Sequence, residues 1–384
     1  MNDVIYLDNS ATTPVEEPVI EAMLPYLRTE YGNASSFHGS GRAARRAIDS
    51  TREIIAGHLG ILPEEIVFTA GATEANNLAI IGSAYASTNR KHIVTSSIEH
   101  HAVLHTAEWL RTQGFELTVV DVDSTGLVDP EAIREAIRDD TLLVSVMAGN
   151  NEIGTIQPIG EIGRLCKERG ILFHSDAVQA YGKVDLPMDA VDFLSISAHK
   201  FHGPKGVGFL FARKGTKLTP LLHGGGHERG LRSGTENVPG IVGLGAATEL
   251  VFTEHDEITT RMKRFRERLI DRVLQIAGTR LNGHRTECLP HIANFSFQAI
   301  EGESLIMRLD EHGIMASTGS ACSSPDLEAS HVLVAIGVPL SMAHGSLRIS
   351  TGRQTTDAEI ETFLDALPQV VEDLRAISPF KVGE

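Results

Sequence analysis

The sequence contains little cysteine. Only three of its 384 residues are cysteines, Cys166, Cys288 and Cys322, and no two of them form a Cys-x-x-Cys pair. Because an odd number of cysteines cannot all pair within one chain, neither a disulfide scaffold nor a zinc site made of cysteines alone is expected. This cysteine usage is typical of a reducing compartment, and it predicts the cytoplasm.

Positive charge and long apolar runs are also scarce. Lys and Arg number 34 against 50 Asp and Glu, which gives a net charge of −16. A chain this acidic repels nucleic-acid phosphates and anionic lipids, so neither is expected as a partner. No apolar run approaches the length of a membrane span, and the first residues show no basic segment followed by an apolar one. We therefore expect no contact with a membrane.

Short apolar runs and amphipathic segments alternate between residues 65 and 212. Strands are expected at residues 66–69, 92–96, 117–121, 142–147, 172–175, 193–197 and 207–212. Helices are expected at residues 74–86, 102–113, 130–137 and 159–169. This alternation predicts an α/β fold with a mostly parallel seven-stranded sheet, covered on both faces, whose ligand lies at the carboxyl ends of the strands.

The pattern changes after about residue 250. A long amphipathic helix is expected at residues 257–276, where Ile258, Met262 and Phe265 recur at spacings of three or four. Further segments follow, with strands expected at 291–298 and 346–350 and helices at 304–312 and 357–376. These segments predict a smaller α+β domain made of residues 1–14 and 254–384, beside a large domain made of residues 15–253.

Three features at expected strand ends suggest a bound cofactor. Lys200 ends the run Ser197-Ala198-His199-Lys200 and could form a Schiff base, although an ordinary surface lysine is more common. Asp176 ends an apolar strand, where a pyridinium N–H would satisfy it; a helix N-cap accounts for it equally well. The small residues before Thr73 let backbone N–H groups approach a phosphate, although simple capping by Thr73 is the alternative. In one α/β domain the three features together indicate pyridoxal phosphate.

Other residues indicate the chemistry at this cofactor. Cys322 lies among Ser, Thr and Gly in residues 317–325, a loop that could carry a thiolate into and out of a site. A buried structural cysteine fits these small polar neighbours poorly. His100 and Asn151 follow expected strands, where the first could stack on a ring or move protons and the second could simply form a turn. Arg348 could clamp a carboxylate or form a structural ion pair.

These residues lie in stretches that resemble the cysteine desulfurases, pyridoxal-phosphate enzymes that supply sulfur for iron–sulfur clusters and other thio-cofactors. The resemblance covers nearly the whole chain and is carried by residues 6–9, 11–14, 32–36, 73–77, 99–100, 150–154, 174–179, 197–200, 232–237 and 319–322. The segment around Cys322, with residues 330–333 after it, is similar to the subgroup that has a long mobile cysteine loop. The resemblance implies a fold-type I enzyme whose large domain binds the cofactor and whose small domain carries this loop.

The resemblance also implies the roles of individual residues. Cys322, Lys200 and His100 would be catalytic: Lys200 would bind the cofactor, and Cys322 would attack the substrate sulfur. The residues expected to bind the cofactor are Ala72, Thr73, His100, Asn151, Asp176, Gln179, Ser197, His199, Lys200 and, from the other subunit of a homodimer, Thr235. The residues expected to bind the substrate are Asn9, Asn33, Asn151 and Arg348. No metal ion is expected to be held by the protein alone, although Cys322 could be a transient ligand of an iron–sulfur cluster.

The implied activity is a sulfurtransferase reaction. L-Cysteine is converted to L-alanine, the sulfur passes to Cys322 as a persulfide, and an acceptor or cluster scaffold protein then receives it. A selenocysteine lyase or another pyridoxal-phosphate β-lyase is the alternative within the same chemistry. A non-catalytic protein on the same fold is a third hypothesis, which the presence of Lys200, Asp176 and Cys322 disfavours.

Overall fold

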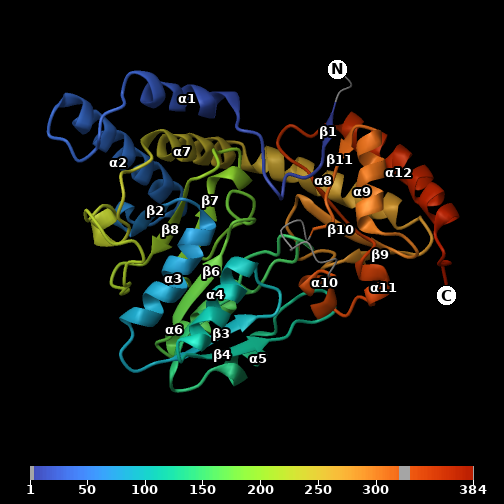
Figure 1. The fold of residues 1–384 in the computed structure, drawn as a ribbon, viewed down its shortest axis with the longest axis horizontal. Coiled ribbons are helices and arrows are strands. Elements are labelled where there is room, and N and C mark those ends of the chain that lie inside the picture. The colour runs from blue at the N-terminus through green and yellow to red at the C-terminus, as the bar shows by residue number, and fades with distance from the viewer. Residues whose placement is uncertain (1–3, 320–328, 384) are drawn as a thin grey trace.

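The larger sheet lies on one side of the molecule. A computed structural model describes residues 4–319 and 329–383 (Figure 1). The strands of this sheet are β2 (Ile66–Thr69), β3 (His92–Ser96), β4 (Glu116–Val120), β5 (Thr141–Ser145), β6 (Leu172–Asp176), β7 (Phe193–Ser197) and β8 (Gly208–Ala212). Their order is β2-β8-β7-β6-β5-β3-β4, and all neighbours are parallel except the two pairs that β8 makes. The predicted α/β fold with a mostly parallel seven-stranded sheet is confirmed.

Helices cover both faces of this sheet because consecutive strand residues point to opposite sides. Val67, Ile93 and Leu143 share a core with α3 (Ala72–Ala86) and α4 (His101–Thr112). The residues next to them, among them Ile66 and Val94, share the opposite core. The helices of that second core are α2 (Gly39–Leu59), α5 (Pro130–Ala136), α6 (Ile159–Glu168) and α7 (Val238–Thr253), and α1 (Glu17–Arg28) packs against α7. None of the described helices is both long enough and apolar enough to cross a membrane.

A second, smaller unit contains the carboxyl-terminal third of the chain (Figure 1). Its antiparallel sheet has the order β12-β10-β9, and β1 pairs with β11 in parallel beside it. The strands are β1 (Ile5–Tyr6), β9 (Thr279–Asn282), β10 (Ile292–Phe297), β11 (Ile314–Met315) and β12 (Ser346–Ser350). The helices are α8 (His255–Val273), α9 (Gly302–Glu311), α10 (His331–Ala335), α11 (Leu340–Ala343) and α12 (Asp357–Ile377). Single 3-10 turns in the larger unit are η1 (Pro63–Glu65), η2 (Ala198–Lys200) and η3 (Glu228–Gly230).

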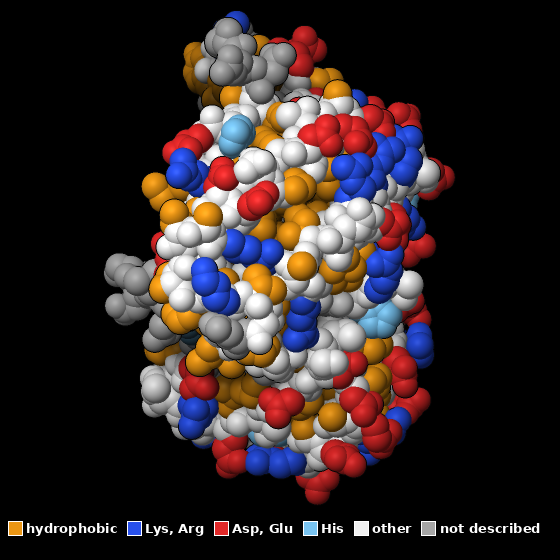
Figure 2. Space-filling view, turned by 90° about the vertical axis from the view of Figure 1, so that its right-hand side faces the viewer, with side chains coloured by type: hydrophobic (Ala, Val, Ile, Leu, Met, Phe, Trp, Pro, Cys, Tyr) orange, Lys and Arg blue, Asp and Glu red, His pale blue; other side chains and the backbone are white. Residues whose placement is uncertain are grey.

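The apolar core, rather than surface charge, holds the smaller unit together. Ile5 and Leu7 join α8, α9, α12 and the antiparallel sheet in this core, whereas Val19 of α1 belongs to the core of the larger unit. The surface of α8 and α12 carries ion pairs, such as that between Arg268 and Glu361 at 2.8 Å. Figure 2 shows acidic and basic side chains intermingled on this side of the molecule. Exposed ion pairs of this kind contribute about 0–1 kcal/mol each.

Five of the described helices were not predicted, namely α1, α2, α7 and the short α10 and α11. Helix α7 lies buried beneath α1 and α2, so its apolar residues run nearly all round it and leave no amphipathic stripe. Helix α2 does carry such a stripe, which includes the buried Ala44, Ile48 and Ile55, and its periodicity was available in the sequence.

The packing of α6 can be tested with one added methyl group. In Gly163→Ala the new Cβ would lie 2.2 Å from the carbonyl oxygen of Ala190, so backbone must move. We expect the free energy of unfolding to fall by about 1–3 kcal/mol. Gly57→Ala in α2 is the matched control. Its Cβ would meet nothing within 4 Å, so the variant should gain about 0.5–1 kcal/mol. Urea unfolding measures both variants, and a stabilised Gly163→Ala would contradict the packing described.

Candidate active site

A cavity of about 1060 Å³ lies at the carboxyl ends of β5, β6 and β7. Segments from both units line it, because Ser10, Ala11 and Thr12 reach it from the amino-terminal segment and Gly319 from the smaller unit. The predicted site residues that line it are Ala72, Thr73, His100, Asn151, Asp176, Gln179, Ser197, His199, Lys200 and Arg348. The structure therefore places the cavity where the fold class predicts a ligand.

Three predicted site residues within the described part of the chain do not line this cavity. The carboxamide of Asn9 donates to the carbonyl oxygens of Ser350 (2.9 Å) and Tyr6 (3.3 Å). Asn33 is exposed, and its side-chain oxygen accepts from the backbone N–H of Ser35. Thr235 is exposed as well. Cys322 lies outside the described residues. In this chain Asn9 thus shapes the backbone near the cavity rather than presenting its carboxamide to it.

Lys200 ends η2, directly after β7. Its Nζ donates to the carbonyl oxygens of Ser10 (2.6 Å) and Ala11 (2.7 Å). The amino-terminal segment is in turn fixed to η2, because the backbone N–H and the hydroxyl of Thr13 both donate to the carbonyl oxygen of His199. The amine of Lys200 is therefore held at the wall of the cavity by backbone carbonyls.

Asp176 ends β6 with its carboxylate facing the cavity. The side chain is almost fully buried, with 6% of the residue exposed. One oxygen accepts from Asn76 Nδ2 at 2.7 Å, and the other accepts from the backbone N–H of Val178 at 3.0 Å. A buried carboxylate held by neutral donors favours a cationic N–H partner in the cavity. Asn76 was not identified from the sequence, although it lies in the stretch 73–77 that carries the resemblance.

The amino terminus of α3 also faces the cavity. Its N-cap is Gly71, which has φ 148° and no side chain to cap the first N–H groups. A Cβ at Gly71 would be strained, and it would lie 3.5 Å from Ser197 Oγ. The N–H groups of the first turn, together with the nearby Ser197 and His199, thus form a cradle suited to a phosphate.

His199 contributes to this cradle as a neutral ring. Burial, and the positive charges of Lys200 and Lys205, lower the pKa of His199 to about 4. Its Nδ1 lies 3.2 Å from the hydroxyl oxygen of Thr12. A neutral His199 ring can offer an anion a hydrogen bond but no positive charge.

His100 caps α4 and lines the cavity. Its Nδ1 accepts from the backbone N–H of Ala102 at 3.1 Å. Because Nδ1 is an acceptor, the proton of the neutral ring lies on Nε2. The capping bond therefore fixes which nitrogen of His100 carries the transferable proton.

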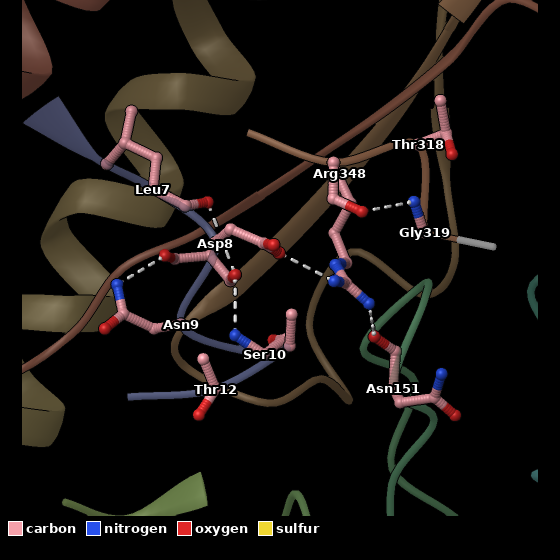
Figure 3. A network of polar contacts seen from close by, with 12 residues as sticks. Leu7, Asp8, Asn9, Ser10, Thr12, Asn151, Thr318, Gly319 and Arg348 are labelled. Atoms are coloured by element: carbon pink, nitrogen blue, oxygen red, sulfur yellow. Dashed lines mark hydrogen bonds and ion pairs between the residues drawn. The ribbon is translucent and has the colours of Figure 1, made fainter. Parts of the chain in front are cut away.

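Arg348 joins three segments around the cavity (Figure 3). Only 3% of this residue is exposed. Its guanidinium donates to Asp8 Oδ1 at 2.8 Å and to the carbonyl oxygen of Asn151 at 2.9 Å. The structural ion pair considered from the sequence is thus present. Because Arg348 also lines the cavity, a substrate carboxylate would meet an arginine already oriented from two sides.

Glu152 lies near both described ends of the segment that contains Cys322. At one end Ser330 Oγ donates to Glu152 Oε2 at 2.5 Å. At the other, Gly319 has φ 93°, and a Cβ there would lie 3.3 Å from the same carboxylate oxygen. Sequence reasoning did not single out Glu152, although it lies in the stretch 150–154. Its side chain binds Ser330 directly and lies close to Gly319.

Burial raises the pKa of both described cysteines. Cys166 is buried in α6, and burial raises its pKa to about 12. Burial also raises the pKa of Cys288, whose half-buried side chain lies in a loop of the smaller unit. The described residues contain no group of three or more His, Cys, Asp or Glu side chains arranged to hold a metal ion.

Comparison with known proteins identifies the family. The family model of the class-V aminotransferases matches residues 5–363. The chain belongs to the class-V aminotransferase family. Within it the chain belongs with the cysteine desulfurases, since it is 54% identical to the cysteine desulfurase IscS of Methanosarcina thermophila, over 100% of this chain and 96% of that protein. This confirms the family predicted from the sequence.

Similar solved structures agree with the fold. A NifS-like protein superposes with a TM-score of 0.91 at 41% identity, over 96% of this chain and 100% of its own. The protein SspA, solved in complex with cysteine, superposes with a TM-score of 0.81 at 38% identity, over 92% of this chain and 100% of its own.

The described residues fit pyridoxal phosphate, the cofactor of these class-V enzymes. The fit rests on three observations: the amine of Lys200 at the cavity wall, the buried carboxylate of Asp176, and the uncapped amino terminus of α3 beside Gly71. They match the aldehyde, the ring nitrogen and the phosphate of the cofactor in chemical type.

Glu99, next to His100, gives a testable pH dependence. It is fully buried, accepts from Ser96 and from the backbone of Met147, and burial raises its pKa from 4.5 to about 8. Between pH 4.5 and pH 8 the Glu99 carboxyl is protonated in the folded state and ionised in the unfolded state. The contribution of Glu99 to the free energy of unfolding therefore falls as the pH rises from 4.5 to 8. From pH 5 to pH 8 we expect the free energy of unfolding to fall by about 2–4 kcal/mol less in Glu99→Gln than in the wild type.

Urea unfolding of the apoprotein at several pH values measures the effect. Glu108→Gln is the control, since Glu108 is exposed on α4. It should leave the pH dependence of the wild type unchanged. Parallel curves for the wild type and Glu99→Gln would contradict the raised pKa.

Proposed function

We propose that the chain is a pyridoxal-phosphate-dependent cysteine desulfurase that forms L-alanine from L-cysteine and transfers the sulfur to Cys322. The observation that carries the proposal is the convergence of Lys200, Asp176 and the amino terminus of α3 on one cavity that Arg348 also lines. The family to which the chain belongs supports the same activity, since its relatives carry that name.

The residues that line the cavity each bind a different group of the cofactor. Bound pyridoxal phosphate supplies an aldehyde for attachment of an amine and a ring that stabilises negative charge on the carbon beside that amine. Lys200 provides the attaching amine, and Asp176 holds the proton of the ring nitrogen. Gln179 donates to the phenolic oxygen. The first turn of α3 holds the phosphate together with Thr73, Ser197 and His199.

The substrate is bound and deprotonated by other groups in the cavity. Arg348 binds the carboxylate of L-cysteine, with Asn151 beside it. Lys200 takes the α-proton of the substrate. Its amine can act as the base because it stays at the cavity wall when it is not bonded to the cofactor. His100 transfers a proton through Nε2, the nitrogen left protonated by its capping bond.

Cys322 receives the sulfur. Its thiolate attacks the substrate sulfur, so that an S–S bond forms while the bond between that sulfur and the β-carbon breaks, and the β-carbon gains a proton. The sum is L-cysteine plus a Cys322 thiol giving L-alanine plus a Cys322 persulfide. An acceptor or scaffold protein of iron–sulfur cluster or thio-cofactor synthesis then takes the outer sulfur. The position of Gly319 at the cavity, three residues before Cys322 in the sequence, supports this role.

The organisation of the chain completes the proposal. Residues 15–253 form the cofactor-binding domain, and residues 1–14 and 254–384 form the small domain. Two copies form a homodimer in which the exposed Thr235 reaches the phosphate site of the other copy. The enzyme works in the cytoplasm, whose reducing conditions suit a reactive thiol. Asn9 fixes the backbone next to Ser10 at the cavity wall, and the role of the exposed Asn33 in substrate binding stays a prediction.

The activity is tested by the products formed from L-cysteine. The holoenzyme should release L-alanine and carry one persulfide, at Cys322. Cys322→Ser should bind the cofactor as the wild type does and form alanine at least about 100-fold more slowly, because the attacking thiolate is gone. Cys288→Ser is the matched control and should keep full activity. Pyruvate and ammonia in place of alanine would identify an eliminating β-lyase instead.

The attachment of the cofactor to Lys200 is tested by visible absorbance. Lys200→Ala should lack the visible band of lysine-bound cofactor, since no other amine is held at that wall by backbone carbonyls among the described residues. Lys205→Ala, at the same cavity, should keep the band. A full-strength band in Lys200→Ala would refute the assignment of Lys200.

A further inference from the structure

The carboxamide of Gln179 has a fixed orientation. Its Nε2 donates to the carbonyl oxygen of Ser10 at 2.9 Å, and a carbonyl oxygen can only accept. The nitrogen of the carboxamide must therefore face Ser10, which leaves Oε1 on the other side. There Oε1 lies 3.2 Å from Nε2 of His291.

This orientation determines the tautomer of His291. Because Gln179 Oε1 has no proton, His291 Nε2 must carry one and donate it. Burial lowers the pKa of His291 well below its usual value, and so do the positive charges of Lys183, Arg348 and Lys200. The ring is therefore neutral, with its proton on Nε2 and an acceptor at Nδ1.

The acceptor Nδ1 lies next to a small polar cavity. His291 is 2% exposed, and its Nδ1 has no hydrogen-bond partner among the described residues; the same is true of Thr351 Oγ1. Both residues line a cavity of about 20 Å³, together with Lys183. Of the protons of Lys183 Nζ, one is donated to the carbonyl oxygen of Lys200 at 3.1 Å. A cavity of this size holds one water molecule, which can carry a hydrogen bond from Lys183 to Nδ1.

We propose that His291 is a positioning residue that fixes the Gln179 carboxamide so that its second N–H serves the ligand in the active-site cavity. Lys183 supports it by supplying the donor for Nδ1 across the small cavity. Without His291 the carboxamide is held by Ser10 alone, so its second N–H is no longer held firmly toward the ligand. This inference deepens the proposed function and rests on it, because the acceptor is the phenolic oxygen of the cofactor.

The first test compares two non-covalent probes on the apoprotein. Pyridoxine 5′-phosphate carries the phenolic oxygen and lacks the aldehyde, whereas its 3-deoxy analogue lacks the phenolic oxygen too. His291→Asn should bind pyridoxine 5′-phosphate about 3- to 10-fold more weakly than the wild type, the loss typical of one hydrogen bond. It should bind the 3-deoxy analogue as the wild type does. Isothermal titration measures both affinities.

Two further variants separate positioning from general damage. His291→Gln places its amide nitrogen where Nε2 lies and should restore wild-type affinity, whereas the Asn amide is one methylene shorter. In a Gln179→Leu background, His291→Asn should cause no further loss, because the group it positions is absent. Equal losses for the two probes, or additive losses in the double variant, would overturn the proposal. If the wild-type apoprotein binds neither probe, the proposed function itself fails, and this inference fails with it.

A spectroscopic measurement on the apoprotein is independent of ligand binding. The nitrogen chemical shifts of labelled histidine report the tautomer of each ring. The signal pair of His291 is the one that disappears in His291→Gln. It should show a proton on Nε2 and should not change between pH 5.5 and pH 8. A proton on Nδ1, or titration near the ordinary pKa of histidine, would overturn the proposal even if the activity is confirmed.

Discussion

The carbonyl oxygen of Ser10 holds two of the side chains on which the cavity depends. It accepts from Lys200 Nζ at 2.6 Å and from Gln179 Nε2 at 2.9 Å. Ser10 is itself fixed to the smaller unit, because its N–H donates to Ser350 Oγ at 2.9 Å. A short amino-terminal segment therefore sets the geometry of residues that follow strands of the larger sheet. The site can form only when this segment lies between the two units.

Much of the cavity could be predicted from the sequence because a mostly parallel sheet places the carboxyl ends of its strands side by side. Lys200 follows β7, Asp176 ends β6, and Thr73 lies in the first turn of α3, the helix after β2. In a mostly parallel sheet the carboxyl ends of such strands meet at one edge, so polar residues at these points come together whatever their separation in sequence. The seven strands of the larger sheet were predicted to within a few residues because buried strands show as apolar runs, whereas the short β1, β9 and β11 were not predicted.

Other parts of the site depend on partners that no sequence pattern links. Asn76 orients Asp176 from 100 residues away, and His291 contacts Gln179 across 112 residues. Asn9 was expected to face the substrate, yet its amide is used by backbone carbonyls. Side-chain contacts of this kind follow from tertiary packing and not from periodicity. Cys322 was singled out from its neighbours alone and lies outside the described residues.

The hydrogen bond between Ser330 and Glu152 has a consequence for how the two units of such enzymes diversify. Ser330 caps α10 of the smaller unit, whereas Glu152 lies in the loop after β5 of the larger sheet. One buried bond thus ties a helix cap in one unit to a loop of the other. A change on either side of this bond must be matched on the other side, so the two units cannot vary independently at this point.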